Sequence, residues 1–445
     1  MSKVQSPEKT NYEELLYDLT YEAANRCIQC GYCLPVCPTY DSMENESQSP
    51  RGRINLVKMA AEGKINIQDD LAGPIELCLG CRACEVACPV NVPYGEIYEG
   101  ALEVINKQKE KKAKNKQMKS NKVLDITLNQ LFPHKKRLRT IGNFTWFYQN
   151  SGLNKMMRKS GVIEKVSKPM GQFEKVLPKI ESPSKRYKYN HIYKPIGEKR
   201  ISVAFFPGCI MDSVMSKANR LTIELLQKCG CEVWIPKSPT CCGALHAHKG
   251  KINGAKDLAR QNIEAFENMD VQYIINNAGG CGAMLYEYDE LLKDDNVWNE
   301  RAKKFSKKSK DVTEVLYELA PLPFEKEWKG LITYQDSCHL RNVQGVIDAP
   351  RELLRSIPGA TYIEMKDSYL CCASGGIYNL LHFDESMQIL DEKMKHAVAT
   401  KAKTIVTTNP GCLLQMKLGI ERNDATKSMK AYHLIEILAE SCGVK

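Results

Sequence analysis

The sequence predicts an α+β multidomain protein, in which a mainly helical N-terminal module precedes a tandem pair of α/β repeats with parallel sheets. Three observations predict this fold class. The 19 cysteines fall into two groups, eight from Cys27 to Cys88 and eleven from Cys209 to Cys442, with none between. The C-terminal half repeats its own pattern at nearly constant spacing. Within each copy, β-branched or aromatic runs alternate with helix-length segments, which favours a parallel sheet flanked by helices.

The composition is that of a globular chain with an unusual number of thiols. Its 445 residues are 43% hydrophobic and 26% charged, with a mean hydropathy of −0.39, and suffice for two or three domains. No run approaches the roughly 18 apolar residues of a membrane span, and the first residues lack the apolar part of a secretory signal. We therefore expect no transmembrane segment and a cytoplasmic location, either free or peripheral on the inner face of the cell membrane. In that reducing environment, so many cysteines indicate metal binding or redox chemistry.

We expect four segments along the chain. Residues 1–105 form the helical module, which opens with an acidic, helix-like run at 12–26. Residues 106–200 form a basic helical or extended connecting segment. The two repeats occupy residues 201–325 and 326–445.

The connecting segment carries most of the positive charge. Between Lys107 and Arg200 there are 25 Lys or Arg against 6 Asp or Glu, a balance of +19, so the rest of the chain carries −9. Its basic residues include Lys135, Lys136, Arg137 and Arg139. No recognition motif accompanies this charge, so we expect no nucleic-acid partner. We interpret the segment as a docking surface for an acidic partner or an anionic membrane, or as a solvated face. The lysine-rich run 107–122 is expected to be a solvated helix or a disordered arm, and residues 168–199 an extended linker.

Two cysteine motifs define the N-terminal module. The runs CIQCGYCLPVCP at 27–38 and CLGCRACEVACP at 78–89 both read Cys-x2-Cys-x2-Cys-x3-Cys-Pro. This is the bacterial run that holds [4Fe–4S] clusters, so the module is expected to be a bis-[4Fe–4S], ferredoxin-like domain. Zinc sites usually separate two cysteine pairs by a longer loop and need only four ligands. Gly31 and Gly80 allow the backbone to approach the cluster closely.

The spacing also predicts how the ligands are shared. Three cysteines in one tight loop reach three irons of a cube, and crowding sends the fourth to the other cluster. One cluster is therefore expected on Cys27, Cys30, Cys33 and Cys88. The other is expected on Cys78, Cys81, Cys84 and Cys37. Two clusters in one short module indicate an electron relay.

The C-terminal half contains two equivalent sets of four cysteines. Equivalent cysteines lie 129, 130, 130 and 131 residues apart. Each cysteine follows a predicted strand closely, and ligand sites in open α/β sheets gather at the carboxyl ends of strands. We therefore expect two similar metal or redox sites, each an iron–sulfur or zinc centre. Their ligands would be Cys209, Cys241, Cys242 and Cys281 in the first copy, and Cys338, Cys371, Cys372 and Cys412 in the second.

These motifs carry a family resemblance over nearly the whole chain. Each repeat resembles the cysteine-rich CCG domain found in heterodisulfide reductase and in the subunits of respiratory dehydrogenases. Two ferredoxin motifs followed by two such domains resemble the iron–sulfur subunit of glycolate oxidase. Further matching stretches are SPRGRI at 49–54, GGCGAML at 279–285, DSCHL at 336–340 and NPGCLLQ at 409–415. Family members with a well-defined CCG cluster have one more cysteine, where this chain has Ala278 and Asn409, and the second copy reads Cys-Cys-Ala.

The resemblance implies an electron-transfer subunit of a glycolate (2-hydroxy-acid) oxidase or dehydrogenase. The chain has no GxGxxG after a strand, no GxxxxGK[ST] and no evident flavin or nicotinamide site. We therefore expect an FAD-containing partner subunit and a quinone or membrane acceptor, with no substrate oxidation by this chain alone and no catalytic residue in it. Alternatives are the iron–sulfur subunit of a D-lactate or glycerol-3-phosphate dehydrogenase, a heterodisulfide reductase-like thiol–disulfide oxidoreductase, and a metal-stabilised anchoring protein.

Several other side chains have simpler interpretations. His339 adjoins Cys338, and His246 and His248 follow the first Cys-Cys pair, but packed or surface histidines are commoner than ligands. Cys229, Cys231 and Cys442 have no repeat partner and are expected to be small buried apolar residues.

Overall fold

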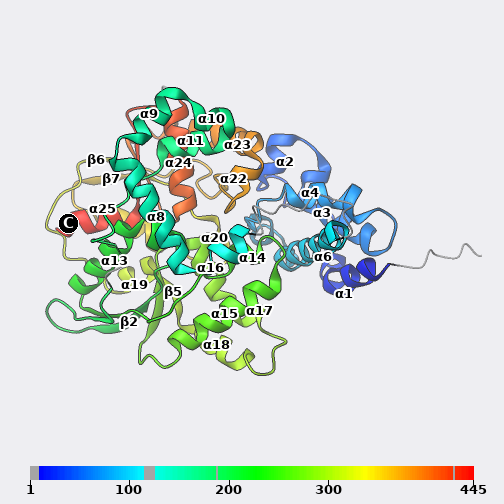
Figure 1. The fold of residues 1–445 in the computed structure, drawn as a ribbon, viewed down its shortest axis with the longest axis horizontal. Coiled ribbons are helices and arrows are strands. Elements are labelled where there is room, and N and C mark those ends of the chain that lie inside the picture. Colours follow the sequence, from blue (N-terminus) through cyan, green and yellow to red (C-terminus); the bar gives the residue numbers. More distant parts are fainter. Residues whose placement is uncertain (1–9, 115–125, 187–188, 424–425) are drawn as a thin grey trace, which may run out of the picture. The chain divides into compact units, whose positions relative to one another are not determined.

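The computed structural model describes residues 10–114, 126–186, 189–423 and 426–445. The chain divides into two compact units (Figure 1). The first contains residues 1–125 and 245–254, and the second contains residues 126–244 and 255–445. None of the helices in the described ranges combines the length and the apolar character needed to cross a membrane.

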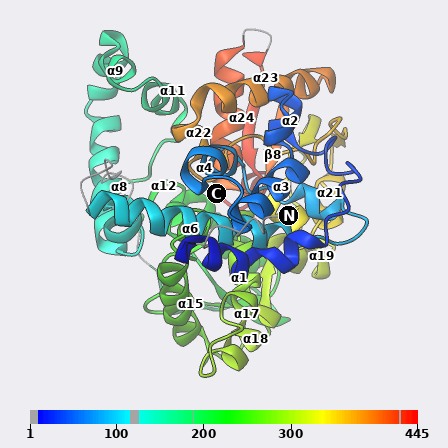
Figure 2. The same ribbon diagram turned by 90° about the vertical axis from the view of Figure 1, so that its right-hand side faces the viewer.

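The N-terminal unit consists of short helices around one apolar core. They are α1 (Asn11–Asn25), α2 (Pro38–Met43), η1 (Glu46–Gln48), α3 (Pro50–Ala61), η2 (Ile67–Leu71), α4 (Ala72–Glu76), α5 (Ala83–Val86) and α6 (Tyr94–Lys114). α1 begins at a capping box, in which Thr10 Oγ1 accepts a bond from the Glu13 N–H and the Glu13 carboxylate accepts one from the Thr10 N–H. Leu16 of α1, Val57 of α3 and Ile97 of α6 are buried in the same core. α1 and α6 lie side by side in Figures 1 and 2.

The two cysteine motifs occupy turns between these helices. The first motif follows α1 and ends at Cys37, the N-cap of α2, where Pro38 takes the first helical position. The second follows α4, passes through α5 and ends at Cys88, before α6. The backbone is left-handed at Gly31 (φ 86°) and Gly80 (φ 61°), where glycine avoids the strain that a Cβ would bring.

The second unit contains two sheets. Their strands are β1 (Ile192–Tyr193), β2 (Ile201–Phe205), β3 (Cys231–Trp234), β4 (Tyr273–Asn276), β5 (Ser309–Asp311), β6 (Gly330–Tyr334), β7 (Ala360–Tyr362), β8 (Thr404–Thr407) and β9 (Lys430–His433). The first sheet has the order β1-β3-β2-β4-β5 and the second has the order β7-β6-β8-β9. Every pair is parallel except β1 with β3. The order makes β2 to β5 equivalent to β6 to β9, and the predicted fold class is confirmed.

Helices connect and cover these strands. In the first repeat they are α12 (Cys209–Val214), α13 (Ser216–Lys228), α15 (Ile252–Phe266), α16 (Gly279–Tyr286), α17 (Tyr288–Leu291), α18 (Asn299–Lys308) and α19 (Val312–Glu318). Between α13 and α15 the chain also forms α14 (Ala244–Ala247), which lies almost entirely in the N-terminal unit. In the second they are α20 (Cys338–Asn342), α21 (Asp348–Arg355), α22 (Tyr378–Leu381), α23 (Phe383–Ala399), α24 (Pro410–Arg422) and α25 (Leu434–Ser441).

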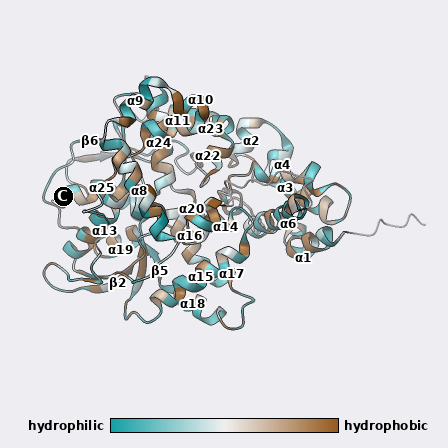
Figure 3. Ribbon diagram, viewed as in Figure 1, coloured by the Kyte–Doolittle hydropathy of each residue, from teal (hydrophilic) through white to brown (hydrophobic). Residues whose placement is uncertain are grey.

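One hydrophobic core runs through both repeats. Phe205 and Leu226 of the first repeat are buried in the same cluster as Tyr334 and Leu438 of the second. Strands such as β2 carry mostly hydrophobic residues, as the colouring of Figure 3 shows. The three cysteines without a repeat partner are buried in this cluster too, as predicted: Cys229, Cys231 and Cys442.

The connecting segment is more helical than its composition predicts. It forms η3 (Thr127–Leu131), α8 (Lys135–Asn150), α9 (Leu153–Ser160), α10 (Val162–Val166) and α11 (Lys168–Val176) before β1. The prediction of an extended linker is therefore wrong over 168–176. Ser167 caps α11, and the proline that follows lies in the first turn, where its missing N–H breaks no helical bond. The lysine-rich run 107–122 continues α6 as far as Lys114, and the rest of it lies outside the described residues.

Candidate metal centres

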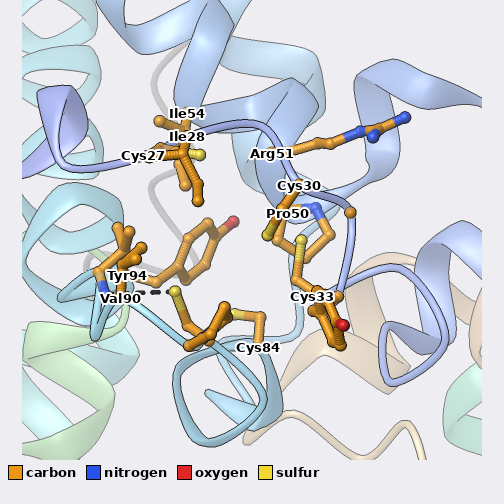
Figure 4. Close-up of a pocket in the computed structure, with 15 residues that line it drawn as sticks. Cys27, Ile28, Cys30, Cys33, Pro50, Arg51, Ile54, Cys84, Val90 and Tyr94 are labelled. Atoms are coloured by element: carbon orange, nitrogen blue, oxygen red, sulfur yellow. Dashed lines mark hydrogen bonds between the residues drawn. The ribbon is translucent and has the colours of Figure 1, made fainter.

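The first cysteine motif surrounds an open cavity in the N-terminal unit. The cavity has a volume of about 400 Å³ including its solvent mouth, and its cysteines are Cys27, Cys30, Cys33, Cys84 and Cys88. Figure 4 shows Cys30 and Cys33 pointing into this space from one loop, with Cys84 and the Tyr94 ring facing them. Cys88, the last cysteine of the second motif, thus lies with the first three of the other motif. Cys30 is exposed at the mouth.

The second motif surrounds a separate cavity of about 300 Å³. Its cysteines are Cys37, Cys78, Cys81 and Cys84. Here Cys37, the last cysteine of the first motif, lies with the first three of the second. The two cavities share a wall formed by Pro50, Cys84 and Tyr94. Each predicted set of four ligands therefore lines a single cavity, and the exchange of Cys37 and Cys88 is the one that the spacing predicts.

The chemistry of the thiols fits a bound cluster. Burial raises the pKa of Cys33 to about 11 and that of Cys84 well above its ordinary value. Without a metal these side chains would therefore remain neutral thiols at pH 7. Because a coordinating metal deprotonates a thiol outright, the irons of a bound cluster would stabilise the thiolate form that burial otherwise disfavours at these positions.

The four cysteines of the first repeat converge at the carboxyl ends of three parallel strands. Cys209 follows β2, the Cys241–Cys242 pair follows β3 and Cys281 follows β4. The Sγ atoms of Cys209 and Cys241 are 3.7 Å apart. The Cys241 and Cys281 thiols lie beside Cys242 and raise its pKa.

The second repeat gathers its cysteines in the same way. Cys338 follows β6, the Cys371–Cys372 pair follows β7 and Cys412 follows β8. The free thiols of Cys338 and Cys371 interact, and the Cys372 thiol interacts with those of Cys371 and Cys412. The structure thus brings together both predicted sets of four. Within the described ranges, no three His, Cys, Asp or Glu side chains are arranged to hold a single metal ion.

Two residues outside the motifs fix the Cys241–Cys242 loop. Asn262 of α15 is fully buried, donates to the Cys241 carbonyl (2.9 Å) and accepts from the Thr240 N–H (3.0 Å). Tyr288 donates its hydroxyl to the Cys242 carbonyl (2.8 Å). Neither residue can be recognised in the sequence, because each belongs to an ordinary amphipathic segment and its role depends on contacts with a distant loop.

The second repeat has a cation near its cysteine pair. Lys393 of α23 is 3% exposed and donates to the Asp367 carbonyl. Burial lowers its pKa to about 8, while the nearby Cys372 and Cys371 thiols raise it in part. The sequence does not reveal this residue either, because lysine normally indicates a surface position.

The connecting segment contributes to the first repeat's site. Lys135 and Leu138 of α8 line a cavity of about 330 Å³ together with Cys209 and Cys241. Arg139 forms an ion pair with the buried Asp212 (3.6 Å). Lys136 and Arg137 are exposed. Arg139 thus already uses its charge within the fold, and the docking surface of Lys135, Lys136, Arg137 and Arg139 stays a prediction.

The flagged histidines differ in their surroundings. His246 is 2% exposed, and burial lowers the pKa of His248 to about 4, so His248 is neutral at pH 7. Both lie in the N-terminal unit. The burial of His246 agrees with the packed interpretation, and the His248 side chain is 25% exposed. His339 Nδ1 lies 3.4 Å from Cys338 Sγ.

Comparisons with protein families match each part of the chain. A 4Fe-4S dicluster domain matches residues 23–92, and a cysteine-rich domain (CCG) matches residues 203–286 and 332–417. The linker region of the glycolate oxidase iron-sulfur subunit matches residues 121–177. The fold and the gathered cysteines thus define an iron–sulfur protein with a dicluster module and two cysteine-rich domains.

Comparisons with individual proteins identify the family within this class. The probable glycolate oxidase iron-sulfur subunit of Bacillus subtilis is 47% identical over 94% of both chains. The glycolate oxidase iron-sulfur subunit of Escherichia coli is 28% identical, over 87% of this chain and 88% of that protein. The chain belongs to the glycolate oxidase iron–sulfur subunit family, and the resemblance found in the sequence is confirmed.

Two further similarities are partial or remote. Lactate utilization protein A of Oceanobacillus iheyensis is 34% identical, over 54% of this chain and 96% of that protein. Among solved structures, a hypothetical protein from Helicobacter pylori covers 78% of this chain and 77% of its own, at 12% identity and a TM-score of 0.42.

Proposed function

We propose that this chain is the electron-transfer subunit of a glycolate-type 2-hydroxy-acid dehydrogenase. It would receive electrons from an FAD-containing partner subunit and deliver them toward a quinone-type acceptor at the inner face of the cell membrane. Family membership supports the role, and the glycolate oxidase subunits among the relatives support the substrate class.

The proposal includes the ligands. One [4Fe–4S] cluster would be held by Cys27, Cys30, Cys33 and Cys88, and the other by Cys37, Cys78, Cys81 and Cys84. Further iron–sulfur or zinc centres would be held by Cys209, Cys241, Cys242 and Cys281, and by Cys338, Cys371, Cys372 and Cys412. When bound, iron–sulfur clusters supply one-electron transfer.

One observation in particular supports an electron relay between the two N-terminal centres. The two cavities of the N-terminal module share the wall of Pro50, Cys84 and Tyr94, so a donor and an acceptor site are in contact across one layer of side chains. Tyr94 and Cys84 fill this layer and exclude water from it, since both are less than a tenth exposed. Cys30 is exposed at the mouth of the first cavity, which leaves that cavity accessible to an electron donor.

The test uses the native complex, purified anaerobically. Glycolate should bleach the visible absorption of the iron–sulfur centres in the complex, and it should leave the isolated subunit unchanged, because the subunit offers no acceptor for a hydride. The flavoprotein that co-purifies identifies the partner. Bleaching of the isolated chain by glycolate, or a complex without flavin, would contradict the proposal.

A lactate-oxidising system is the second candidate. The observation that favours it is the 34% identity to a lactate utilization protein, although the match covers only 54% of this chain. The same complex can be given glycolate, D-lactate or glycerol 3-phosphate in parallel. The substrate that reduces the flavin fastest decides between the candidates.

A further inference from the structure

Among the described residues of the N-terminal unit, the most deeply buried cation lies at the second cysteine cavity. Arg53 of α3 is 1% exposed and lines the cavity together with Cys37 and Cys78. Its guanidinium donates to the Pro74 carbonyl (2.8 Å), the Thr39 hydroxyl (3.1 Å) and the Gln48 side-chain carbonyl (2.9 Å).

These three partners are all neutral. In the part of the chain that the structure describes, no carboxylate forms an ion pair with Arg53. Burying a charge without a counter-charge is costly, so buried cations are normally paired with an anion. The groups beside Arg53 that can become anionic are the thiols of the cavity. Thr39 Oγ1 accepts a hydrogen bond from Arg53 and lies 3.3 Å from Cys37 Sγ, so it links the guanidinium to this thiol.

A second arginine on the same helix provides the contrast. Arg51 lines the first cavity, but its Nε lies 2.7 Å from Glu46 Oε1, so its charge is already neutralised. It is also partly exposed, and in Figure 4 its guanidinium points away from the cavity. The second cavity is also lined by Arg82, whose Nε lies 2.6 Å from Glu85 Oε2. Each cavity therefore has one arginine neutralised by a carboxylate, and the second has Arg53 in addition, without one.

We propose that Arg53 raises the reduction potential of the centre held by Cys37, Cys78, Cys81 and Cys84, and thereby separates the potentials of the module's two centres. A fixed positive charge stabilises the more negative, reduced state, and the charge and hydrogen bonds around a cluster set its potential. The inference rests on the proposed ligand set. It assigns Arg53 a positioning and tuning role and no contact with substrate.

The test is a redox titration of the anaerobically purified full chain, followed by electron paramagnetic resonance. Arg53→Gln should lower the midpoint potential of one centre by about 59 mV or more, a tenfold change in its one-electron equilibrium. The other centre should shift less. Arg53→Lys keeps the charge and should keep most of the potential, and Arg51→Gln is the matched control that should leave the second centre unchanged.

A second variant separates charge from packing. Gln48→Glu places a carboxylate where Arg53 already donates, with the same number of side-chain heavy atoms, so it should lower the same potential as Arg53→Gln. The affected signal should be the one that Cys37→Ser perturbs. An unchanged potential in Gln48→Glu, or an equal fall in Arg53→Lys and Arg53→Gln, would overturn the inference. If the unmodified chain showed fewer than two paramagnetic resonance signals, the proposed ligand sets would instead be contradicted.

Discussion

The two cysteine-rich repeats place four thiols at the ends of equivalent strands, but the side chains around those thiols differ in charge. The offset of 131 residues that relates Cys281 to Cys412 also relates Asn262 to Lys393. Asn262 is neutral and holds the Cys241 carbonyl, whereas Lys393 brings a buried cation to the second pair. The strand order thus determines where the thiols lie, and single residues on the covering helices determine their electrostatic environment.

The last strands of the two sheets differ in a similar way. β5 ends at Asp311 and β9 ends at His433, and each residue caps the next helix in a capping box. Both side chains are buried. Burial raises the pKa of Asp311 to about 7 and lowers the pKa of His433. Equivalent caps therefore respond to pH in opposite directions.

The largest effect is expected from removing either cysteine pair. C241S/C242S, or C371S/C372S, should abolish electron transfer to quinone in the complex while glycolate still reduces the flavin, because each change removes two thiolates from one loop. The matched control is C229A/C442A, which also removes two buried cysteines but none of the gathered ones.

The outcome shows which role the repeats have. If both double variants block quinone reduction, both repeats carry electrons. Undiminished quinone reduction in both would show that the repeats are structural. Loss of flavin reduction in an intact complex would instead place these cysteines at the substrate chemistry.

A medium effect is expected from neutralising the two caps. The folded-state pKa of Asp311 lies above its ordinary value of 3.8, so the free energy of unfolding falls as the pH rises from about 4 to about 7. Asp311→Asn keeps the oxygen that accepts from the Thr313 N–H. It should raise the free energy of unfolding by about 2 to 4 kcal/mol near pH 8, and by less near pH 5. Urea unfolding of the full chain across this range measures the difference.

His433 supplies the opposite case. Its folded-state pKa is lowered, so its contribution to stability is present above the ordinary value of 6.5 and is lost as the pH falls below it. His433→Asn should therefore remove a loss of stability that develops as the pH falls below 6.5, whereas Asp311→Asn should remove a loss that develops as the pH rises from about 4 to about 7. A change of the same sign in the pH slope of stability for both variants would contradict the difference between the caps.

The smallest effect is expected where the repeats read Cys-Cys-Gly and Cys-Cys-Ala. Gly243 has φ 94° and Ala373 has φ 63°, which is a left-handed conformation that an L-residue tolerates better. Gly243→Ala would also bring its Cβ to 3.3 Å from the Ala255 carbonyl oxygen. It should lower the free energy of unfolding by about 1 to 2 kcal/mol, whereas Ala373→Gly should change it by less than about 1 kcal/mol. Equal effects in thermal unfolding would mean that the two loops are under the same strain.

The sequence predicts the parts of this molecule that depend on spacing. Cysteine spacing within the Cys-x2-Cys-x2-Cys-x3-Cys-Pro runs predicts both motifs and the exchange of Cys37 and Cys88. In the repeats, the position of each cysteine after a strand predicts the two sets of four, because the carboxyl ends of parallel strands meet at one edge of a sheet. The alternation of strands and helices gives the parallel sheets.

The features that the sequence does not reveal depend on contacts between distant segments. The SPRGRI stretch does not indicate that Arg53 is buried and Arg51 partly exposed, since this depends on Thr39, Gln48 and Pro74. Lys393 resembles a surface lysine until α23 packs over the Cys371–Cys372 loop. The helix α11 is not predicted from the sequence, because its proline usually breaks a helix, although proline is compatible with the first turn.

The exchange of cysteines between the two N-terminal cavities also constrains biosynthesis. In the proposed ligand sets, the first spans Cys27 to Cys88 and the second spans Cys37 to Cys84, so both enclose nearly the same stretch of chain. A ribosome would therefore release the chain as far as Cys84 before either proposed set is complete, and a truncation anywhere before Cys88 would remove part of at least one set. Cofactor insertion is accordingly expected after translation of the whole module, when a single folding event presents both cavities to the assembly machinery.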